Sequence, residues 1–445
     1  MQRINSRGAA QEVGMNSLQE LYNQLVNKGD SGEIEMAIIA AVEQHEKWRT
    51  QESINLHAGK NVMSEKARRL MASPGLVDHS VSGAIAKRNA AGARFIDEIE
   101  TLTVALLCRL FHAQYVEYRA MSGNLANGIA LCALTRPGDT IMVVPRRFYG
   151  HYSWLDGGYP RYIGLRVEEI PFKENGFHVD TEVFRKKANE LRPTLIIVGT
   201  FIHLFPTPLA EIREVADSIG SKVMYDGAHV MGLIAGQCFQ DPLSEGAHIL
   251  TGSTQKTLPG PIGGILACND PEIGRKIVEA TDGLLSNYAN NRVAAMAMSA
   301  AEMLRYGKEY AAAIVKNAQT LAEALDREGL TVIGKSMGYT ASHQVIIDAG
   351  PFGAGRKAAE ILERANLICT RFALSSDYPQ FLANPNGVRF GVSAVTRLGM
   401  GSNEIGRIAR LIKEALVTPE KIEGVRREVK DIAGCFSKVR YSFDS

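Results

Sequence analysis

A lysine, an aspartate and a histidine follow short apolar runs that a helix-covered sheet would bring together. Asp226 ends the run Lys222–Asp226, His229 lies three residues later, and Lys256 follows a second run, His248–Thr251. Ligand-binding groups of open α/β sheets gather beyond the carboxyl ends of the strands. At that edge the amine could form a Schiff base with an aldehyde, and the carboxylate could pair with a positively charged ring nitrogen.

A polar turn upstream supplies a third element. The segment Ser122–Asn127, with the sequence SGNLAN, opens an apolar helix. Unpaired amides and the helix dipole make such a helix N-terminus a binding site for anions. Pyridoxal 5'-phosphate (PLP) requires a lysine for its aldimine, a carboxylate at its pyridinium nitrogen, amides for its phosphate and a flat side chain against its ring. We therefore predict that Lys256 holds PLP as a Schiff base and that Asp226 pairs with the ring nitrogen.

Each of these residues also has an ordinary explanation. Lys256 alone could be a solvated surface lysine, Asp226 a cap at a strand end, and Ser122 an N-cap. A lone histidine such as His151 or His229 is usually structural or exposed. Only the joint pattern, in this order on consecutive α/β units, favours the cofactor site.

The elements that would position these residues are visible as uninterrupted apolar runs. Five such runs, each rich in β-branched residues, cover 140–144, 194–199, 222–226, 248–251 and 263–268. Runs of this kind are typical of strands buried on both faces, which predicts an α/β domain. Between the second and third runs lies an amphipathic helix that ends at Gly220. The sequence predicts a helical N-terminal arm over 1–55, in which Leu18 to Leu25 recur at helical spacing, a large domain over 56–305 and a smaller α+β domain over 306–445.

Composition excludes several classes of protein. The chain has 445 residues, 45% of them hydrophobic, and a net charge of +2, which does not favour nucleic acid as the partner. Six scattered cysteines form no Cys-x-x-Cys pair, so we expect neither a metal site nor a redox pair. We see no apolar run long enough for a membrane span and no signal-peptide core, so a cytoplasmic protein is expected.

Two segments carry a family resemblance. Tyr225–Ala235 (YDGAHVMGLIA) and Ser253–Gly264 (STQKTLPGPIGG) resemble the serine hydroxymethyltransferase family, which belongs to the fold-type I PLP enzymes. The resemblance extends from about Ile54 to about Leu411. It implies a mixed, mostly parallel seven-stranded sheet between helices in the large domain. It also implies a homodimer or tetramer with active sites at subunit interfaces.

The resemblance assigns roles to individual positions. Lys256 matches the aldimine lysine, and with His151 and Asp226 it would form the catalytic set. Arg389 matches the arginine that binds the substrate carboxylate, a role that its planar fork suits. The residues expected to bind the cofactor are Ser122, Gly123, Asn124, His151 (stacked on the ring), Thr200, Asp226, His229 (near the phenolic oxygen), Thr254 and Lys256.

Departures from the family pattern concentrate on the folate side. The family's Tyr-x-Glu-Gly-Tyr-Pro-Gly segment is replaced by residues 76–92, which lack its tyrosines and glutamate. Asp78 or His79 is a candidate for handling the β-hydroxyl proton, although neither falls at the matching position. Further differences are Asn124 for a serine, Gln255 for a histidine, Ile262 for an arginine, Phe201 at a hydroxyl position beside Thr200, and Ala289 and Asn290 near a missing Gly-Gly.

The segments Lys256–Pro261 and Gly391–Met400 also resemble threonine transaldolases and α-methylserine-type relatives. We therefore predict an enzyme that makes or breaks the Cα–Cβ bond of a β-hydroxy-α-amino acid, with an aldehyde as second substrate and without classical folate chemistry. The alternatives are hydroxymethyl transfer dependent on tetrahydrofolate, another PLP reaction (transamination, racemisation or decarboxylation), and a non-catalytic PLP-binding protein, since a fold does not settle the reaction.

Overall fold

The structure, a computed structural model, describes residues 20, 23, 30–77, 80–81, 83, 85, 88, 91–174, 176–379 and 382–444. The chain divides into two compact units, Met1–Ser53 and Ile54–Ser445. The first unit contains α2 (Ser31–Lys47), whose N-cap residue Asp30 accepts a hydrogen bond from the Glu33 amide, and a π-helical turn, Trp48–Glu52. Of the helix expected through Leu18 to Leu25, the structure describes only residues 20 and 23, and both are helical.

The second unit contains the remaining elements. Its helices are α3 (Glu65–Met71), α4 (Pro74–Val77), α5 (Arg94–Leu110), α6 (Gly123–Leu134), α7 (Tyr159–Ile163), α8 (Thr181–Leu191), α9 (Leu209–Ile219), α10 (Met231–Ala235), α11 (Pro242–Glu245), α12 (Pro271–Leu284), α13 (Asn290–Arg327), α14 (Ala354–Arg364), α15 (Ser393–Arg397), α16 (Ser402–Val417) and α17 (Ile422–Cys435). Its strands are β1 (Ile54–Asn55), β2 (Ser80–Val81), β3 (Tyr115–Glu117), β4 (Thr140–Val143), β5 (Arg166–Glu169), β6 (Leu195–Val198), β7 (Lys222–Asp226), β8 (Ile249–Ser253), β9 (Gly264–Cys268), β10 (Tyr288–Ala289), β11 (Gln344–Asp348), β12 (Leu367–Ile368), β13 (Thr370–Phe372) and β14 (Gly387–Gly391).

A seven-stranded sheet organises this unit. Its strand order is β3-β9-β8-β7-β6-β4-β5, and each neighbouring pair from β8 to β5 is parallel. Only β9 runs against its two neighbours. The predicted fold class, a mixed and mostly parallel sheet between helices, is confirmed. All five strands expected from apolar runs are present.

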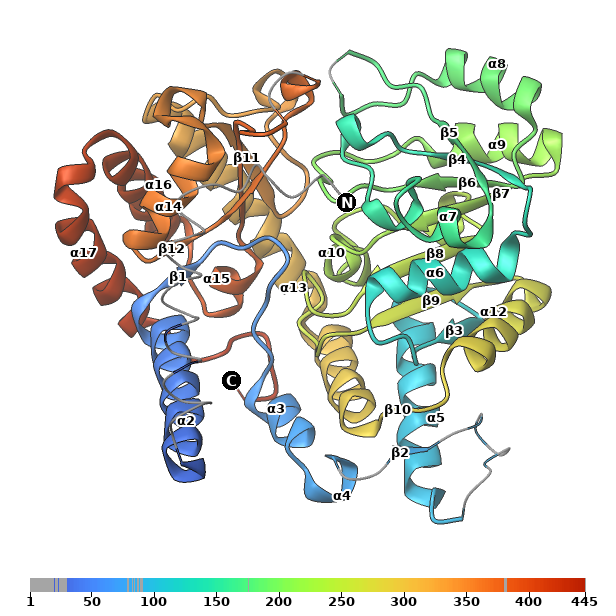
Figure 1. Ribbon diagram of the computed structural model, residues 1–445, viewed down its shortest axis with the longest axis horizontal. Helices are drawn as coiled ribbons and strands as arrows, with labels where there is room; N and C mark the ends of the chain where they lie inside the picture. The colour runs from blue at the N-terminus through green and yellow to red at the C-terminus, as the bar shows by residue number, and fades with distance from the viewer. Residues whose placement is uncertain are drawn as a thin grey trace. The chain divides into compact units, whose positions relative to one another are not determined.

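Alternate residues of the central strands pack on opposite faces of the sheet. Ile141 and Val143 lie in one apolar cluster with residues of α6 and α12, while Met142 and Val144 lie in another with residues of α5, α9 and α13. Figure 1 shows α6 and α12 in front of the sheet. Because both faces are covered, the strands contain continuous apolar runs instead of an alternation of polar and apolar residues.

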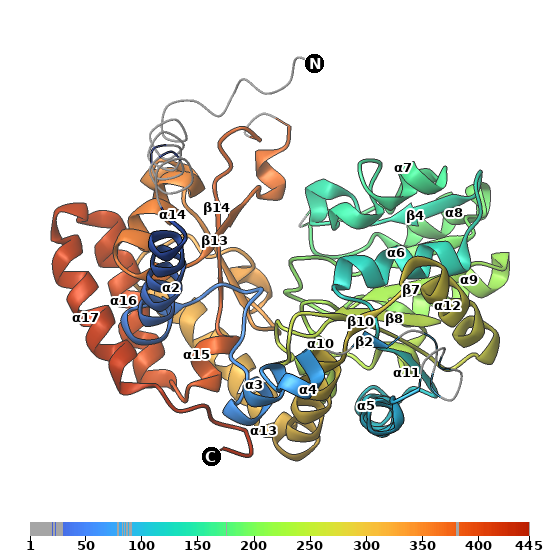
Figure 2. The ribbon, with the colours of Figure 1, turned by 60° about the horizontal axis from the view of Figure 1, so that its bottom comes forward.

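The C-terminal part contains a smaller antiparallel sheet, β11-β14-β13, with α14 and α16 packed near it (Figure 2). The long helix α13 begins at Asn290 and continues through residue 305, where the sequence predicts a domain boundary. Within α13, Glu302 forms a fully buried ion pair with Arg397 of α15 at 2.6 Å. The division at 305 stays a prediction, because residues 54–445 form one compact unit.

All six cysteines are free. Among the helices that the structure describes, none is both long and apolar enough to cross a membrane.

Candidate active site

The carboxyl ends of β7 and β8 and the N-terminus of α6 surround one cavity. About 260 Å³ of space lies between its walls. It is lined by Gly123, Asn124, Asn127, His151, Thr200, Phe201, Asp226, Ala228, His229, Ser253 and Lys256. Seven of the ten residues predicted to form the site therefore line one cavity, which tertiary structure assembles from five segments of the chain.

Asp226 is held rigidly at the end of β7. Its side chain is buried, with Oδ2 accepting a hydrogen bond from Asn127 Nδ2 at 2.7 Å and Oδ1 accepting one from the Ala228 amide at 2.8 Å. The Thr251 hydroxyl donates to Asn127 Oδ1 at 2.7 Å and so fixes which way the Asn127 amide points. These hydrogen bonds fix the orientation of the Asp226 carboxylate. Asn127 has no predicted role, although an amide inside an apolar helix, one turn after the polar start, is a signal for one.

Lys256 enters the cavity from the loop that follows β8. Burial lowers the pKa of its amine to about 8, against the opposing effect of Asp226, and Arg389 lowers it further. The amine forms no hydrogen bond or ion pair with any described residue. The loop is fixed by its backbone: Asn61 Nδ2 donates to the Lys256 carbonyl at 2.6 Å, and the Thr257 hydroxyl donates to the His229 carbonyl at 2.9 Å.

His151 presents a neutral ring to the cavity. Its Nδ1 accepts a hydrogen bond from the Ser153 amide at 3.2 Å and lies 2.8 Å from the Ser153 hydroxyl, so the ring proton resides on Nε2. Burial lowers the pKa of His151, Asp226 opposes this shift, and Lys256 adds to it. A neutral, flat imidazole suits the predicted role of stacking on a cofactor ring.

His229 is a second buried histidine that lines the cavity. Burial, and then the charges of Lys256 and Arg389, hold its pKa well below the usual range. Its Nδ1 lies 3.1 Å from Gln344 Nε2, and its ring stacks on His343 with centroids 5.7 Å apart. Gln344, which has no predicted role, donates from the second sheet and thereby fixes the His229 ring.

The predicted phosphate turn forms the first turn of α6. The Ser122 hydroxyl accepts a hydrogen bond from the Leu125 amide at 3.1 Å, so Ser122 caps the helix and does not line the cavity. Gly123 and Asn124 do line it. A Cβ at Gly123 would lie 2.2 Å from Ser253 Oγ, which explains the glycine. Ser253, a residue with no predicted role, lies beside the turn.

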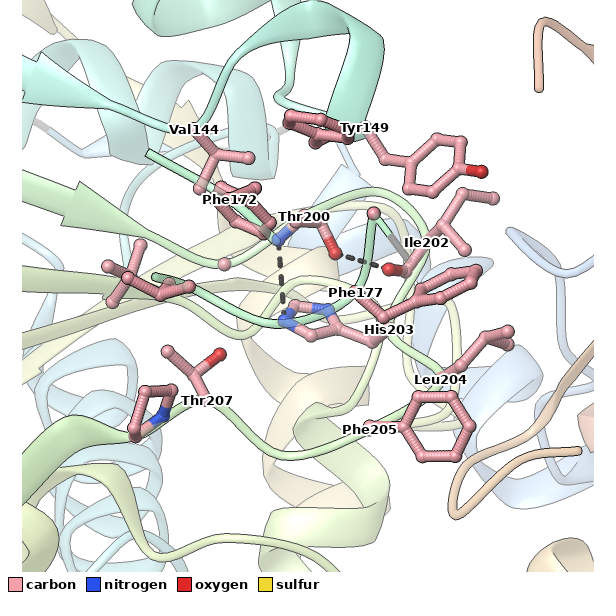
Figure 3. A pocket seen from close by; sticks show the side chains of 16 residues that line it. Val144, Tyr149, Phe172, Phe177, Thr200, Ile202, His203, Leu204, Phe205 and Thr207 are labelled. Atoms are coloured by element: carbon pink, nitrogen blue, oxygen red, sulfur yellow. Dashed lines mark hydrogen bonds between the residues drawn. The ribbon is translucent and has the colours of Figure 1, made fainter. Parts of the chain in front are cut away.

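Thr200 and Thr254, both expected to bind the cofactor, lie in different positions relative to the cavity. Thr200 lines the cavity. Its hydroxyl donates to the Ile202 carbonyl, and its amide donates to His203 Nε2 at 3.3 Å. Figure 3 shows these two bonds in a separate pocket that Thr200 also lines, together with Val144, Tyr149 and Phe172 among others. Thr254 is fully buried and does not line the cavity, because its hydroxyl donates to the Pro261 carbonyl at 2.5 Å. That bond closes the loop that carries Lys256, so the structure gives Thr254 a positioning role in place of the predicted contact with the cofactor.

Arg389 lies on β14, next to the cavity. Its Nη1 donates to the Phe201 carbonyl at 2.8 Å and its Nε to the Thr370 hydroxyl at 3.1 Å. Its guanidinium carbon lies 5.8 Å from the centre of the Phe201 ring. Burial lowers its pKa to about 10, so the group stays cationic at neutral pH. Phe201 and Thr370 engage one N–H of Nη1 and that of Nε, so the remaining N–H groups of the guanidinium are left for an anion.

The residues present fit PLP by their chemistry. They provide an amine with a lowered pKa, a carboxylate held by two hydrogen bonds, a neutral flat ring and a helix N-terminus that lines the same cavity. Lys256 would hold the cofactor, Asp226 its ring nitrogen and the first turn of α6 its phosphate. Within the described residues no group of His, Cys, Asp and Glu side chains could hold a metal ion. Asp78 and His79 lie outside the described residues.

This sheet and this constellation define a fold-type I, PLP-dependent enzyme that acts on amino acids. The serine hydroxymethyltransferase family model matches residues 33–412, and the chain belongs to that family.

Known relatives agree with this assignment. The chain is 41% identical to a serine hydroxymethyltransferase of Thermococcus kodakarensis, over 92% of this chain and 95% of that protein. It is 39% identical to the enzyme of that name from Aeropyrum pernix, over 90% and 91% of the two chains. Among solved structures it is similar to the L-threonine transaldolase of Pseudomonas fluorescens in its internal aldimine state. That match has a TM-score of 0.82 and 26% identity, and covers 93% of this chain and 94% of the other.

The rate at which cofactor-free protein binds PLP should depend on pH according to the lowered pKa of Lys256. Only the neutral amine attacks an aldehyde, so we expect the loading rate of cofactor-free protein to rise about tenfold per pH unit up to pH 8 and then to level off. Stopped-flow absorbance between pH 6 and 10 measures this rate. The same series with Lys256→Ala gives the non-covalent contribution for subtraction. A rate that still rises at pH 10, as for an amine with the ordinary pKa of 10.5, would contradict the assignment.

Proposed function

We propose that this enzyme makes or breaks the Cα–Cβ bond of a β-hydroxy-α-amino acid, with an aldehyde as the other reactant and without tetrahydrofolate. The observation that carries the proposal is the position of Arg389. Its guanidinium is bonded to the carbonyl of Phe201, a residue that lines the Lys256 cavity. An amino acid whose carboxylate binds Arg389 would therefore lie beside the cavity that Lys256 lines.

Each residue of the site has a task in this reaction. Bound PLP supplies a protonated ring that accepts the electron pair left at Cα when a bond to that carbon breaks. Asp226 would keep the proton on the ring nitrogen of bound PLP, because a fixed carboxylate favours the charged pyridinium. His151 would supply the flat side chain against the ring and exclude water. Lys256 would hold the cofactor between turnovers, and its amine would take up or return a proton beside Cα. Arg389 orients the substrate carboxylate.

Two observations support folate-independent chemistry over hydroxymethyl transfer. The similar solved structure belongs to an L-threonine transaldolase. In addition, residues 76–92 lack the tyrosines and the glutamate of the family's segment. The names of the relatives near 40% identity support the second candidate, hydroxymethyl transfer dependent on tetrahydrofolate.

Substrate trials with and without tetrahydrofolate separate the candidates. Purified enzyme is incubated with L-threonine, L-serine or α-methyl-L-serine, and aldehyde, glycine, D-alanine and keto acid are quantified. We expect aldehyde release from at least one substrate at a rate that tetrahydrofolate changes less than about twofold. Strict dependence on tetrahydrofolate would establish hydroxymethyl transfer. Keto acid without aldehyde would establish transamination. Bound PLP whose absorbance responds to no amino acid would indicate a non-catalytic protein.

The proposal includes a homodimer or tetramer in the cytoplasm. An apolar groove between α3, α5 and α13 supports the assembly. It is lined by Leu70, Leu76, Ile99, Leu102, Leu106, Met298 and Phe443 among others. Leu102 is 60% exposed there, which is unusual for a leucine among apolar neighbours and is typical of a surface that another subunit covers.

A further inference from the structure

A second, larger cavity opens beside the cofactor cavity. Its space amounts to about 780 Å³, against about 260 Å³ for the cofactor cavity. His151 and Phe201 line both, so the two spaces share a wall. We refer to the larger one as the outer cavity. A substrate bound in the cofactor cavity would extend its substituent past His151 and Phe201 into this space.

Apolar residues and two arginines line the outer cavity. The apolar side chains are those of Leu155, Phe372 and Tyr378, and the arginines are Arg146 and Arg371. No acidic side chain is among the described residues that line it. The two arginines come from separate parts of the chain, Arg146 from a 3-10 helix after β4 and Arg371 from β13.

Both arginines are available to a ligand. Arg146 and Arg371 are exposed, and neither forms an ion pair with any described residue. Their neighbour Arg147 differs, because its guanidinium carbon lies 4.4 Å from the centre of the Phe148 ring and it does not line the outer cavity. Two exposed arginines without an ion-pair partner among the described residues, next to apolar side chains of the same cavity, are suited to a molecule with an apolar body and an anionic end.

We propose that the outer cavity selects an aldehyde, or the matching β-hydroxy-α-amino acid, whose Cβ substituent is an apolar group ending in a carboxylate or phosphate. Arg146 and Arg371 are the residues that determine this specificity. The inference rests on the proposed function, since it names the substrate class of the same site.

The reaction balances without a further reactant. In the synthetic direction Cα of the amino acid loses a proton and bonds to the aldehyde carbon, and the aldehyde oxygen gains a proton to become the β-hydroxyl. In the cleavage direction the β-hydroxyl loses its proton, the Cα–Cβ bond breaks, the aldehyde leaves and Cα gains a proton. Nothing is oxidised or reduced.

Paired substrates that differ only in charge test the proposal. Cleavage of β-(4-carboxyphenyl)serine is compared with that of β-(4-carbamoylphenyl)serine in the holoenzyme. We expect kcat/KM to be at least about 10-fold higher for the carboxylate. Arg371→Gln combined with Arg146→Gln should remove this preference by lowering kcat/KM for the carboxylate. Arg147→Gln is the matched control and should keep the preference. Arg371→Lys, which retains the charge, should keep part of it.

Binding of unreactive probes gives a readout that does not depend on turnover. Calorimetry with benzoate, phenyl phosphate and benzamide should show tighter binding of one or both anions, which the double variant loses and added salt weakens. The tighter anion identifies carboxylate or phosphate as the natural group. Arginine-dependent binding without cleavage of either serine derivative would support the cavity assignment and contradict the proposed function. Equal affinity for benzamide and the anions, or a charge preference that survives the double substitution, would overturn the inference.

Discussion

Replacing Lys256 by alanine should lower kcat/KM for the amino acid substrate at least ~10⁴-fold, because the variant loses the amine that holds PLP and exchanges it for substrate. The amine has no hydrogen-bond or ion-pair partner among the described residues, and burial lowers its pKa to about 8. Its removal therefore leaves no unsatisfied group behind, and the fold should survive. Steady-state kinetics and a thermal melt of the same preparation measure both effects.

A chemical readout separates the covalent role from a structural one. Borohydride reduction followed by peptide mass spectrometry should place the cofactor on Lys256 in the wild type and on no residue in Lys256→Ala. Lys276→Ala, which removes an exposed lysine paired with Glu272 on α12, should retain activity and labelling. Near-normal turnover by Lys256→Ala, or labelling at another lysine, would rule out the assignment.

Replacing Asp226 by asparagine should reduce kcat/KM about 10³-fold through the loss of the negative charge at the ring nitrogen. The hydrogen bonds that Asp226 accepts add to the loss of activity. Both Asp226 oxygens accept hydrogen bonds, one from Asn127 and one from the Ala228 amide. An asparagine can accept only at its single oxygen, so its NH₂ group would face another donor. We expect weaker retention of PLP on dialysis, together with slower exchange of the substrate α-proton for deuterium.

Exchange of the substrate α-proton, compared among variants, shows whether Asp226→Asn acts through loss of the negative charge or through loss of the fold. Asp217→Asn, which alters an exposed carboxylate paired with Arg213, is the matched control and should behave as wild type. Asp226→Glu retains the charge and should recover part of the exchange rate. If Asp226→Asn exchanged the α-proton at the wild-type rate when saturated with PLP, the carboxylate would not serve the ring nitrogen.

The central strands could be predicted because each carries its own signal. Runs such as Leu195–Val198 are buried on both faces and consist of β-branched and apolar residues. The sheet's outer strands carry no such signal. Tyr115–Glu117 and Arg166–Glu169 are three and four residues long and partly polar, as edge strands usually are. Neither was predicted.

The long helix α13 shows a second limit of sequence patterns. Its C-terminal half has apolar residues at helical spacing, and this pattern predicts a helix over 309–328. Its N-terminal part, which begins at Asn290, buries Val293, Ala294, Ala295 and Met296 in succession. A helix covered on most sides has no single polar face, so its period is not visible in the sequence.

In the site, the sequence by itself determined the reactive groups: the Lys256 amine, the Asp226 carboxylate and the glycine turn at α6, because their chemistry follows from residue type and position after a strand. Tertiary structure decided which groups support them. The contact of Asn127 with Asp226 joins residues 99 positions apart, and that of Gln344 with His229 joins residues 115 apart. Tertiary structure also directs the Thr200 and Thr254 hydroxyls to backbone carbonyls. A buried hydroxyl or amide forms its hydrogen bond with whichever partner the fold brings within reach, and the sequence pattern does not show which partner that is.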